Sequence, residues 1–261
     1  MNIVKIISDE LGVRQSQTEA AVKLIDEGNT IPFIARYRKE ATGALNDEQL
    51  RHLDERLRYL RSLEERKAAV IASIEEQGML TEELKDKIDK ASTLVAVEDL
   101  YRPYKPKKKT RAGIARQKGL EGLAMIISLQ GTNRSIEEEA LSFVSEEKGV
   151  ANVKEAIAGA LDIIAENISD DAQYRTYIRK LSMKEGLISS QAKDKTAESV
   201  YEMYYDFEEP VNKIVGHRIL ALNRGEKEKV LTVKIKPPVD KIIAYLEKQI
   251  ITSDNRFTTP L

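Results

Sequence analysis

The residues best suited to do chemistry in this chain are basic side chains between Asp99 and Glu121, an interval that contains no acidic residue. Guanidinium and ammonium groups bind phosphate through charge and hydrogen bonds, so such a run favours contact with a nucleic-acid backbone. We therefore predict a nucleic-acid-binding surface made of Arg102, Lys105, Lys107, Lys108, Lys109, Arg111, Arg116 and Lys118.

Two prolines determine the expected shape of this stretch. Pro103 and Pro106 fix φ and remove backbone donors, so residues 102–109 are predicted to form an extended surface loop. Thr110 is then a candidate N-cap of a short helix that ends at Gly119. We expect the loop to be anchored by apolar and aromatic side chains and to hold its cations out together; the anchors are Leu100, Tyr101 and Tyr104, and the protruding cations are Lys105, Lys107, Lys108, Lys109 and Arg111.

A plainer interpretation of the same stretch stays open. Runs of charge are often solvated faces, and here the positive charges would face acidic neighbours such as Glu98 and Asp99. On that interpretation the residues are structural.

A second, smaller basic surface is predicted in the segment IPFIARYRKEATG, from Arg36, Arg38 and Lys39. Pro32 suits the first turn of a helix, and the four-residue spacing of Phe33 and Tyr37 predicts that both rings share the buried side. The alternative, which we favour, is a short helix against the core, stabilised by charge pairs that include Glu40.

Few residues indicate catalysis. The chain has no cysteine and two histidines, His52 and His217, neither of which lies in a metal-type cluster. Phosphate-binding glycine loops and the G-x-S-x-G nucleophile motif are absent. We therefore expect a protein that is not an enzyme and has no catalytic residue, no metal site and no cofactor.

The elements that must position the basic residues are mostly helical. Residues 47–77 contain no glycine or proline and carry leucines at three- and four-residue spacing, which predicts one long helix of about 45 Å. Further helices are predicted from capping signals at Ser16, Thr81, Ser135 and Ser169. The expected fold is mainly α, an elongated multi-helical array with the long helix as its main feature.

The composition changes after Gly186. Residues 187–191 and 230–235 are rich in β-branched side chains and are predicted to form a small two-stranded β element. Between them we expect helices over residues 196–205 and 217–224, and a last helix over 239–251 follows. The predicted domains are a helical region, residues 1–186, and a smaller α/β connecting region, residues 187–261.

Three blocks in this sequence resemble a known family. EDLYRPYKPKKKTRAGIARQKGL at residues 98–120, TIPFIARYRKEATG at 30–43 and HRILALNRGEKEKVL at 217–231 are similar to segments of the bacterial Tex family of transcription accessory proteins. The resemblance extends over essentially the whole chain and implies a helical N-terminal region that precedes an RNase H-like domain and a C-terminal RNA-binding module. It therefore implies nucleic-acid binding for a longer parent protein, and residues 255–261, with no closing element, suggest a fragment.

Two function classes follow from these observations. The first is a nucleic-acid-associated scaffold that binds RNA or DNA without sequence specificity and meets the transcription machinery. The second is a protein-interaction or architectural platform whose basic residues contact an acidic surface of RNA polymerase or of the protein's own downstream domains. No membrane contact is expected, because residues 1–11 lack the apolar core of a signal peptide and apolar runs are short. The expected location is the cytoplasm.

Overall fold

The computed structural model describes residues 1–131 and 134–252. Within these ranges the fold is mainly α, as predicted, with thirteen α-helices and one small antiparallel sheet. The chain divides into two compact units, unit 1 (Met1–Tyr101) and unit 2 (Arg102–Leu261). The predicted division near residue 186 stays a prediction, and the last nine residues of its second region, 253–261, lie outside the described part.

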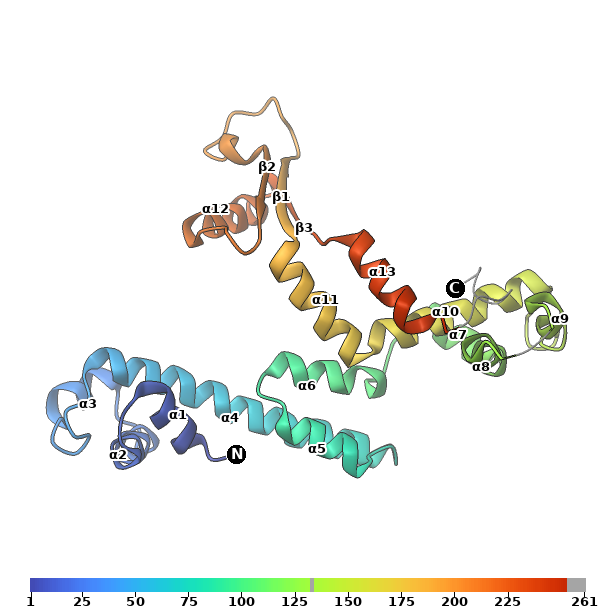
Figure 1. Cartoon of the computed structure of the whole chain (residues 1–261). Coiled ribbons are helices and arrows are strands. Elements are labelled where there is room, and N and C mark those ends of the chain that lie inside the picture. The colour runs from blue at the N-terminus through green and yellow to red at the C-terminus, as the bar shows by residue number, and fades with distance from the viewer. Residues whose placement is uncertain (132–133, 253–261) are drawn as a thin grey trace. The chain divides into compact units, whose positions relative to one another are not determined.

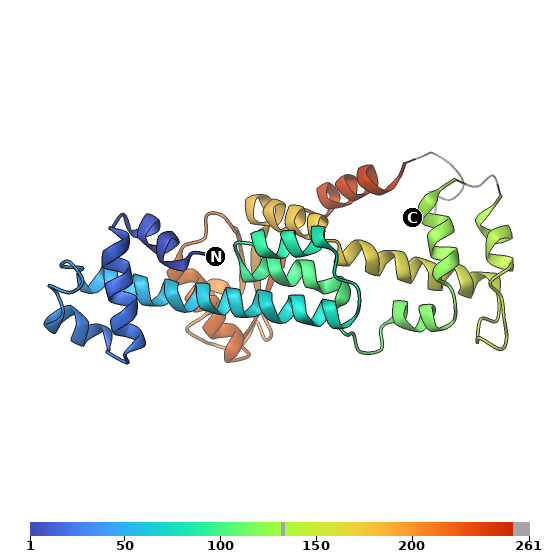
Figure 2. The ribbon, with the colours of Figure 1, turned by 90° about the horizontal axis from the view of Figure 1, so that it is seen from below.

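Unit 1 is built on the predicted long helix, α4 (Asp47–Glu76), which has 30 residues. Asn46 begins it, because its side chain accepts a hydrogen bond from the backbone N–H of Gln49 while the Gln49 side chain bonds back. Its apolar positions at helical spacing are buried: Leu50, Leu53, Leu57, Leu60, Leu63, Val70 and Ile74. Figure 2 shows α4 as one continuous helix.

Shorter helices cover the two ends of α4 (Figure 1). Three of them pack at its N-terminal end: α1 (Ile3–Leu11), α2 (Gln15–Asp26) and α3 (Ile31–Tyr37). Two pack at its C-terminal end, α5 (Glu82–Lys90) and α6 (Leu94–Tyr101). Paired hydrogen bonds from Arg56 to Glu10 and from Arg61 to Asp26 join α4 to α1 and α2 at 2.6–2.8 Å.

Unit 2 begins with a helical cluster around α10 (Val153–Asp170), against which α7 (Arg111–Gln117), α8 (Glu121–Leu129) and α9 (Ile136–Leu141) pack. The shared core is rich in small and aliphatic side chains: Ala112, Ala115, Leu120, Leu123, Ala124, Ile127, Ile136, Ala140, Val150, Ala156, Ala160, Ile163 and Ile164. The predicted caps Thr81, Thr110 and Ser135 are confirmed. The caps expected at Ser16 and Ser169 are wrong, since α2 starts after Arg14 and Asp171 caps α11 (Ala172–Glu185).

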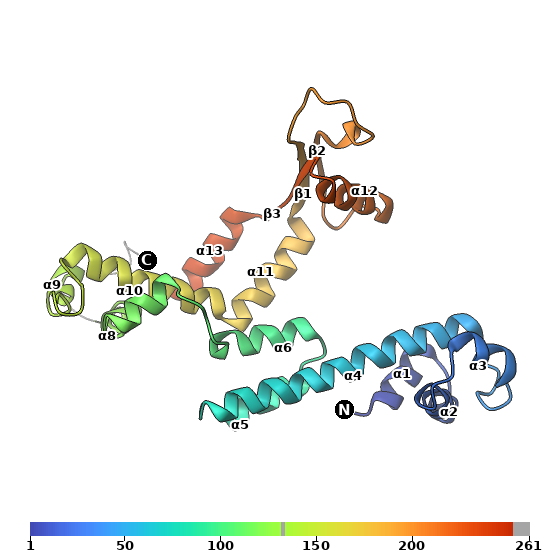
Figure 3. The same cartoon turned by 180° about the vertical axis from the view of Figure 1, so that it is seen from behind.

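The sheet of unit 2 has strand order β2-β1-β3, with both pairs antiparallel. The predicted pair is confirmed as β1 (Leu187–Ala192) and β3 (Leu231–Lys236), and β2 (Asp206–Pro210) is a third strand that was not predicted. The other helices are α12 (Gly216–Lys227), which packs against β3, and α13 (Val239–Ile250), which runs beside α11 (Figure 3).

The helix predicted over residues 196–205 is wrong, because that segment forms turns and a short 3₁₀ helix, Glu202–Tyr204. Local side chains take the backbone groups that a helix would use: Asp194 accepts from the N–H of Thr196 at 2.9 Å, and Ser199 from that of Tyr201 at 3.0 Å. The Tyr201 ring is buried with Leu222 and Leu231, which holds the segment against α12 and β3.

Candidate nucleic-acid interface

The predicted basic residues lie in residues 102–118 of unit 2, here called the basic segment. Its first part is not the extended loop expected from the two prolines, because Arg102–Tyr104 form a 3₁₀ turn. Residues 105–110 then continue without regular structure to α7. Thr110 begins α7 by accepting a hydrogen bond from the N–H of Gly113 at 2.9 Å. Of the expected anchors, Tyr101 is buried, while Leu100 and Tyr104 are half-buried.

Half of the basic segment's predicted contact residues face three carboxylates on α10. Asp162, Glu166 and Asp170 recur every four residues, so they lie along one side of the helix, here called the acidic face of α10. The ion pairs are Arg102 to Asp170 at 2.8 Å, Lys107 to Asp170 and to Glu166, Arg111 to Asp162 at 3.4 Å, and Arg116 to Glu166 at 2.5 Å.

These contacts change the interpretation of Lys107, which was expected to protrude. Its ammonium group instead lies against Asp170 and Glu166, whose side chains are only 8% and 14% exposed. A carboxylate removed from water to that extent needs a positive partner, and Lys107 and its neighbours supply it. The sequence analysis looked for partners next to the segment, at Glu98 and Asp99, whereas these partners lie about sixty residues further along. The four-residue spacing of the three acids was the available signal.

Glu166 is the centre of this ion-pair network. Burial by itself would raise the pKa of Glu166, but hydrogen bonds from Arg116, Thr110 and Lys107 favour the charged form and outweigh it. The pKa of Glu166 therefore lies below its ordinary value. The carboxylate is charged at neutral pH and holds α7 and the preceding loop to α10.

Lys108 and Lys109 differ from the cations that face α10. Lys108 and Lys109 are exposed and form no ion pair with any residue that the structure describes. Together with Lys107, Thr110 and Arg116 they line a hollow of about 200 Å³. Lys105 is also exposed, and Lys118 is half-buried and donates to the backbone oxygen of Gly149 at 2.7 Å. Lys108 and Lys109 are thus exposed cations that no described carboxylate pairs with, whereas Arg111, whose side chain is 86% exposed, is paired with Asp162 at 3.4 Å.

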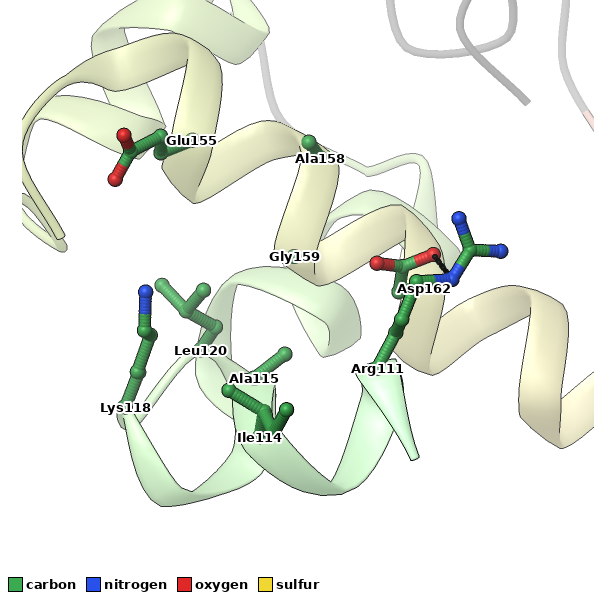
Figure 4. A pocket seen from close by; sticks show the side chains of 9 residues that line it. All are labelled: Arg111, Ile114, Ala115, Lys118, Leu120, Glu155, Ala158, Gly159 and Asp162. Carbon is green, nitrogen blue, oxygen red and sulfur yellow. Dashed lines mark ion pairs between the residues drawn. The ribbon is translucent and has the colours of Figure 1, made fainter. Parts of the chain in front are cut away.

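A shallow groove of about 310 Å³ runs between α7 and α10 (Figure 4). Ala115, Ala158 and Gly159 form part of its lining, with Arg111 on one side and Asp162 on the other. The Arg111–Asp162 ion pair spans the groove at one end. The small side chains in this lining let α7 and α10 approach each other closely.

The second predicted surface, Arg36, Arg38 and Lys39, lies on α3 and the turn after it in unit 1. All three residues are exposed, and among the described residues Arg36 and Lys39 form no ion pair. The expected burial of both rings is wrong: Phe33 is 37% and Tyr37 is 65% exposed. The seven-residue helix buries Ile34 instead, so only a narrow side of α3 faces the core.

The described residues contain no group of three or more histidine, aspartate or glutamate side chains arranged to hold a metal ion. His52 and His217 are both exposed. No helix in the described ranges has the length and apolar character needed to cross a membrane.

Comparison with known proteins identifies two matching family models. Residues 1–75 match the N-terminal domain of Tex-like proteins, and residues 132–255 match the Tex central region. A Bacillus subtilis protein named YdcI is 49% identical over 256 residues, which is 97% of this chain and 35% of that protein.

Two further relatives carry descriptive names. The transcriptional accessory protein Tex of Neisseria gonorrhoeae is 44% identical over 238 residues, covering 90% of this chain and 31% of the relative. The human S1 RNA-binding domain-containing protein 1 is 30% identical over 244 residues, covering 90% and 24%. The chain thus spans about a third or less of the length of these relatives.

Proposed function

The chain belongs to the Tex family, and from this premise we propose that it is a non-enzymatic helical scaffold whose basic segment contacts a phosphate backbone through Lys108 and Lys109. One relative is named for transcription and another for an RNA-binding domain, which supports a nucleic-acid-associated role. The proposed partner is RNA or DNA bound without sequence specificity, with the transcription machinery as a second partner. The proposed location is the cytoplasm.

The observation that carries the phosphate contact is the contrast within the basic segment. Arg102, Lys107 and Arg116 are held by the acidic face of α10, which fixes the loop, while Lys108 and Lys109 between them stay exposed. A fixed loop loses little conformational freedom when it binds. The ammonium groups of the two lysines are therefore available to bind phosphate as point charges. Contacts to phosphate carry little sequence information, so this binding should not depend on base sequence.

The absence of enzymatic activity is part of the proposal. Its support is that the three carboxylates of the acidic face of α10 are each paired with an arginine or lysine. A general base or metal ligand needs an available carboxylate, and these are already engaged.

The test is a charge reversal restricted to the exposed pair, Lys108→Glu with Lys109→Glu. Lys107 is left unchanged, because reversing it would break its ion pairs with Asp170 and Glu166. Binding of the full chain to duplex and single-stranded probes should weaken uniformly across sequences, and the log–log salt slope should fall by about 1 per lysine. The matched control is Lys193→Glu with Lys195→Glu, two exposed lysines elsewhere in unit 2 with the same change in net charge.

If the log–log salt slope changes equally in both variants, the change comes from the net charge of the chain and not from a phosphate contact at Lys108 and Lys109. An unchanged slope in the Lys108, Lys109 variant would instead favour the alternative, a protein-interaction platform. Because both lysines are exposed, thermal unfolding of the variant should match that of the parent chain.

A further inference from the structure

A cluster of exposed rings and cations lies on unit 1, on α3 and the residue pair that follows it. It consists of Phe33, Tyr37, Arg36, Arg38 and Lys39, here called the α3 patch. The Phe33 and Tyr37 ring centroids are 5.2 Å apart, with the ring planes tilted by 46°. The Arg38 guanidinium lies 5.3 Å from the centre of the Phe33 ring.

Both rings of the α3 patch are exposed. Tyr37 is 65% exposed at the end of a helix whose inward side is occupied by Ile34, so its ring contributes little to the core of unit 1. What remains is a mostly exposed ring beside cations that form no ion pair with any described residue. It is the arrangement by which proteins bind unpaired bases, through stacking on the ring and contact of the cations with phosphate.

The charges around the α3 patch are favourable to a polyanion. No acidic residue lies between Glu27 and Glu40 in the sequence. Of the flanking carboxylates, Asp26 pairs with Arg61 and Asp47 with Arg51. Glu40, which follows Lys39, is exposed and forms none of the expected charge pairs with a described residue. Arg36 and Lys39 form no ion pair with any described residue, which leaves their charge available.

We propose that the α3 patch is a binding site for single-stranded nucleic acid, in which an unpaired base stacks on Tyr37 and neighbouring phosphates contact Arg36 and Lys39. A single strand fits better than a duplex because the bases of a duplex are stacked on one another and offer no free face. A single strand can use both features of the patch, because every base has a face that stacks and every nucleotide carries a phosphate. Aromatic residues and arginine are also enriched at protein interfaces, so a protein partner is one of the outcomes that the test distinguishes. The α3 patch belongs to unit 1, whereas Lys108 and Lys109 belong to unit 2.

The chain has no tryptophan, which allows a local measurement. Tyr37→Trp places a single indole in the α3 patch, and a base stacked on it quenches its emission. The control is Met79→Trp, a residue that is 53% exposed beyond the other end of α4, about 45 Å away along a 30-residue helix. The probes are a thymidine oligonucleotide, an abasic strand of the same length, and a duplex.

We expect saturable quenching of the Tyr37→Trp variant by the thymidine strand, little quenching by the abasic strand or the duplex, and none in the Met79→Trp variant. In the otherwise unchanged chain, Tyr37→Ala should weaken single-strand binding by about 5-fold or more, the effect of losing one stacked base, while Tyr37→Phe keeps the ring and the affinity. Circular dichroism should show unchanged helix content for all of these variants.

Three results would overturn the proposal: equal quenching by the abasic strand, which means phosphate contact without stacking; no quenching by any probe; or unchanged affinity after Tyr37→Ala, which would leave the patch to a protein partner. Because the indole reports only on α3, repeating the titration with Lys108→Glu and Lys109→Glu present separates this site from the proposed phosphate contact. The quenching should persist in that background.

Discussion

Glu166 illustrates how one side chain decides the state of the basic segment. Its carboxylate lies between Lys107 of the loop and Arg116 of α7, so a single half-buried group fixes the two parts of the segment at once. The positive charge of both residues is largely neutralised inside unit 2. The basic segment therefore contains two sets of cations: those that pair with the acidic face of α10 and are structural, and Lys108 and Lys109, which are available to a ligand.

The first prediction concerns replacement of that carboxylate. Glu166→Gln leaves Lys107 and Arg116 without their shared negative charge, so the free energy of unfolding of unit 2 should fall by about 1–3 kcal/mol at neutral pH. Thermal or urea unfolding followed by circular dichroism measures this change. Glu147→Gln, an exposed glutamate with the same change in net charge, should shift the transition by less than about 0.5 kcal/mol.

The second prediction is that the difference in the free energy of unfolding between the parent chain and Glu166→Gln depends on pH. The pKa of Glu166 is lower in the folded protein than its ordinary value of 4.5, so the unfolded chain binds the proton more readily. Stability from this carboxylate is therefore complete above pH 4.5 and is lost as pH falls through the lowered folded pKa. The gap between the parent chain and Glu166→Gln should close across that acid range. A gap that is constant down to the acid transition would mean that the effect of the substitution is not electrostatic.

At the element scale, the packing of α7 on α10 depends on small side chains. A Cβ added to Gly159 would lie 2.4 Å from Cδ1 of Leu120, and Leu120 is only 1% exposed. Ala115 approaches the same position at 3.3 Å. This close approach brings the acidic face of α10 within ion-pair distance of the basic segment, so packing and charge pairing have a common geometric cause.

The third prediction tests this packing. Gly159→Val should destabilise unit 2 by about 1–3 kcal/mol, because the added methyl groups overfill a buried seam that cannot expand freely. Ala165→Val is the matched control: Ala165 is an exposed residue of the same helix that does not line the groove, so the same side chain there costs only its helix propensity, a few tenths of a kcal/mol. Equal shifts of the unfolding transition in the two variants would contradict a tight seam at Gly159.

The sequence predicted the start of a helix well where a capping side chain next to the helix determines it. Thr81 and Thr110 begin α5 and α7 because their side chains satisfy nearby backbone donors, which is a property of a few adjacent residues. The caps expected at Ser16 and Ser169 failed locally, but three other failures involve distant partners. The turns at residues 196–205 depend on the burial of Tyr201 against Leu231, and the pairing of Lys107 depends on Asp170 in another helix. The exposure of Tyr37 likewise depended on how α3 meets α4.

At the scale of the whole molecule, each unit has its own buried core and its own ion pairs. Unit 1 is held by the leucines of α4 and by the pairs that Arg56 and Arg61 make with α1 and α2. Unit 2 has the separate cluster around α10 and a smaller one beside the sheet. The two proposed contacts with nucleic acid are divided in the same way, with the α3 patch in unit 1 and Lys108 and Lys109 in unit 2.

This division leads to the last prediction, that a core substitution in one unit leaves the other unit's stability unchanged. Leu60 is 2% exposed on α4, so Leu60→Ala should cost unit 1 about 2–5 kcal/mol, and amide hydrogen exchange over α4 should accelerate about 30-fold or more. Exchange over residues 102–131 and 134–252 should stay at its parent rate. The reciprocal variant is Leu123→Ala in unit 2, a fully buried leucine with the same change in volume, which should accelerate exchange around α8 and α10 and leave α4 protected. Separate cores predict separate responses because a compact unit with its own core can open as its own cooperative unit. Acceleration of both units by either substitution would show instead that they unfold as one cooperative body, and the two nucleic-acid contacts would then be coupled through it.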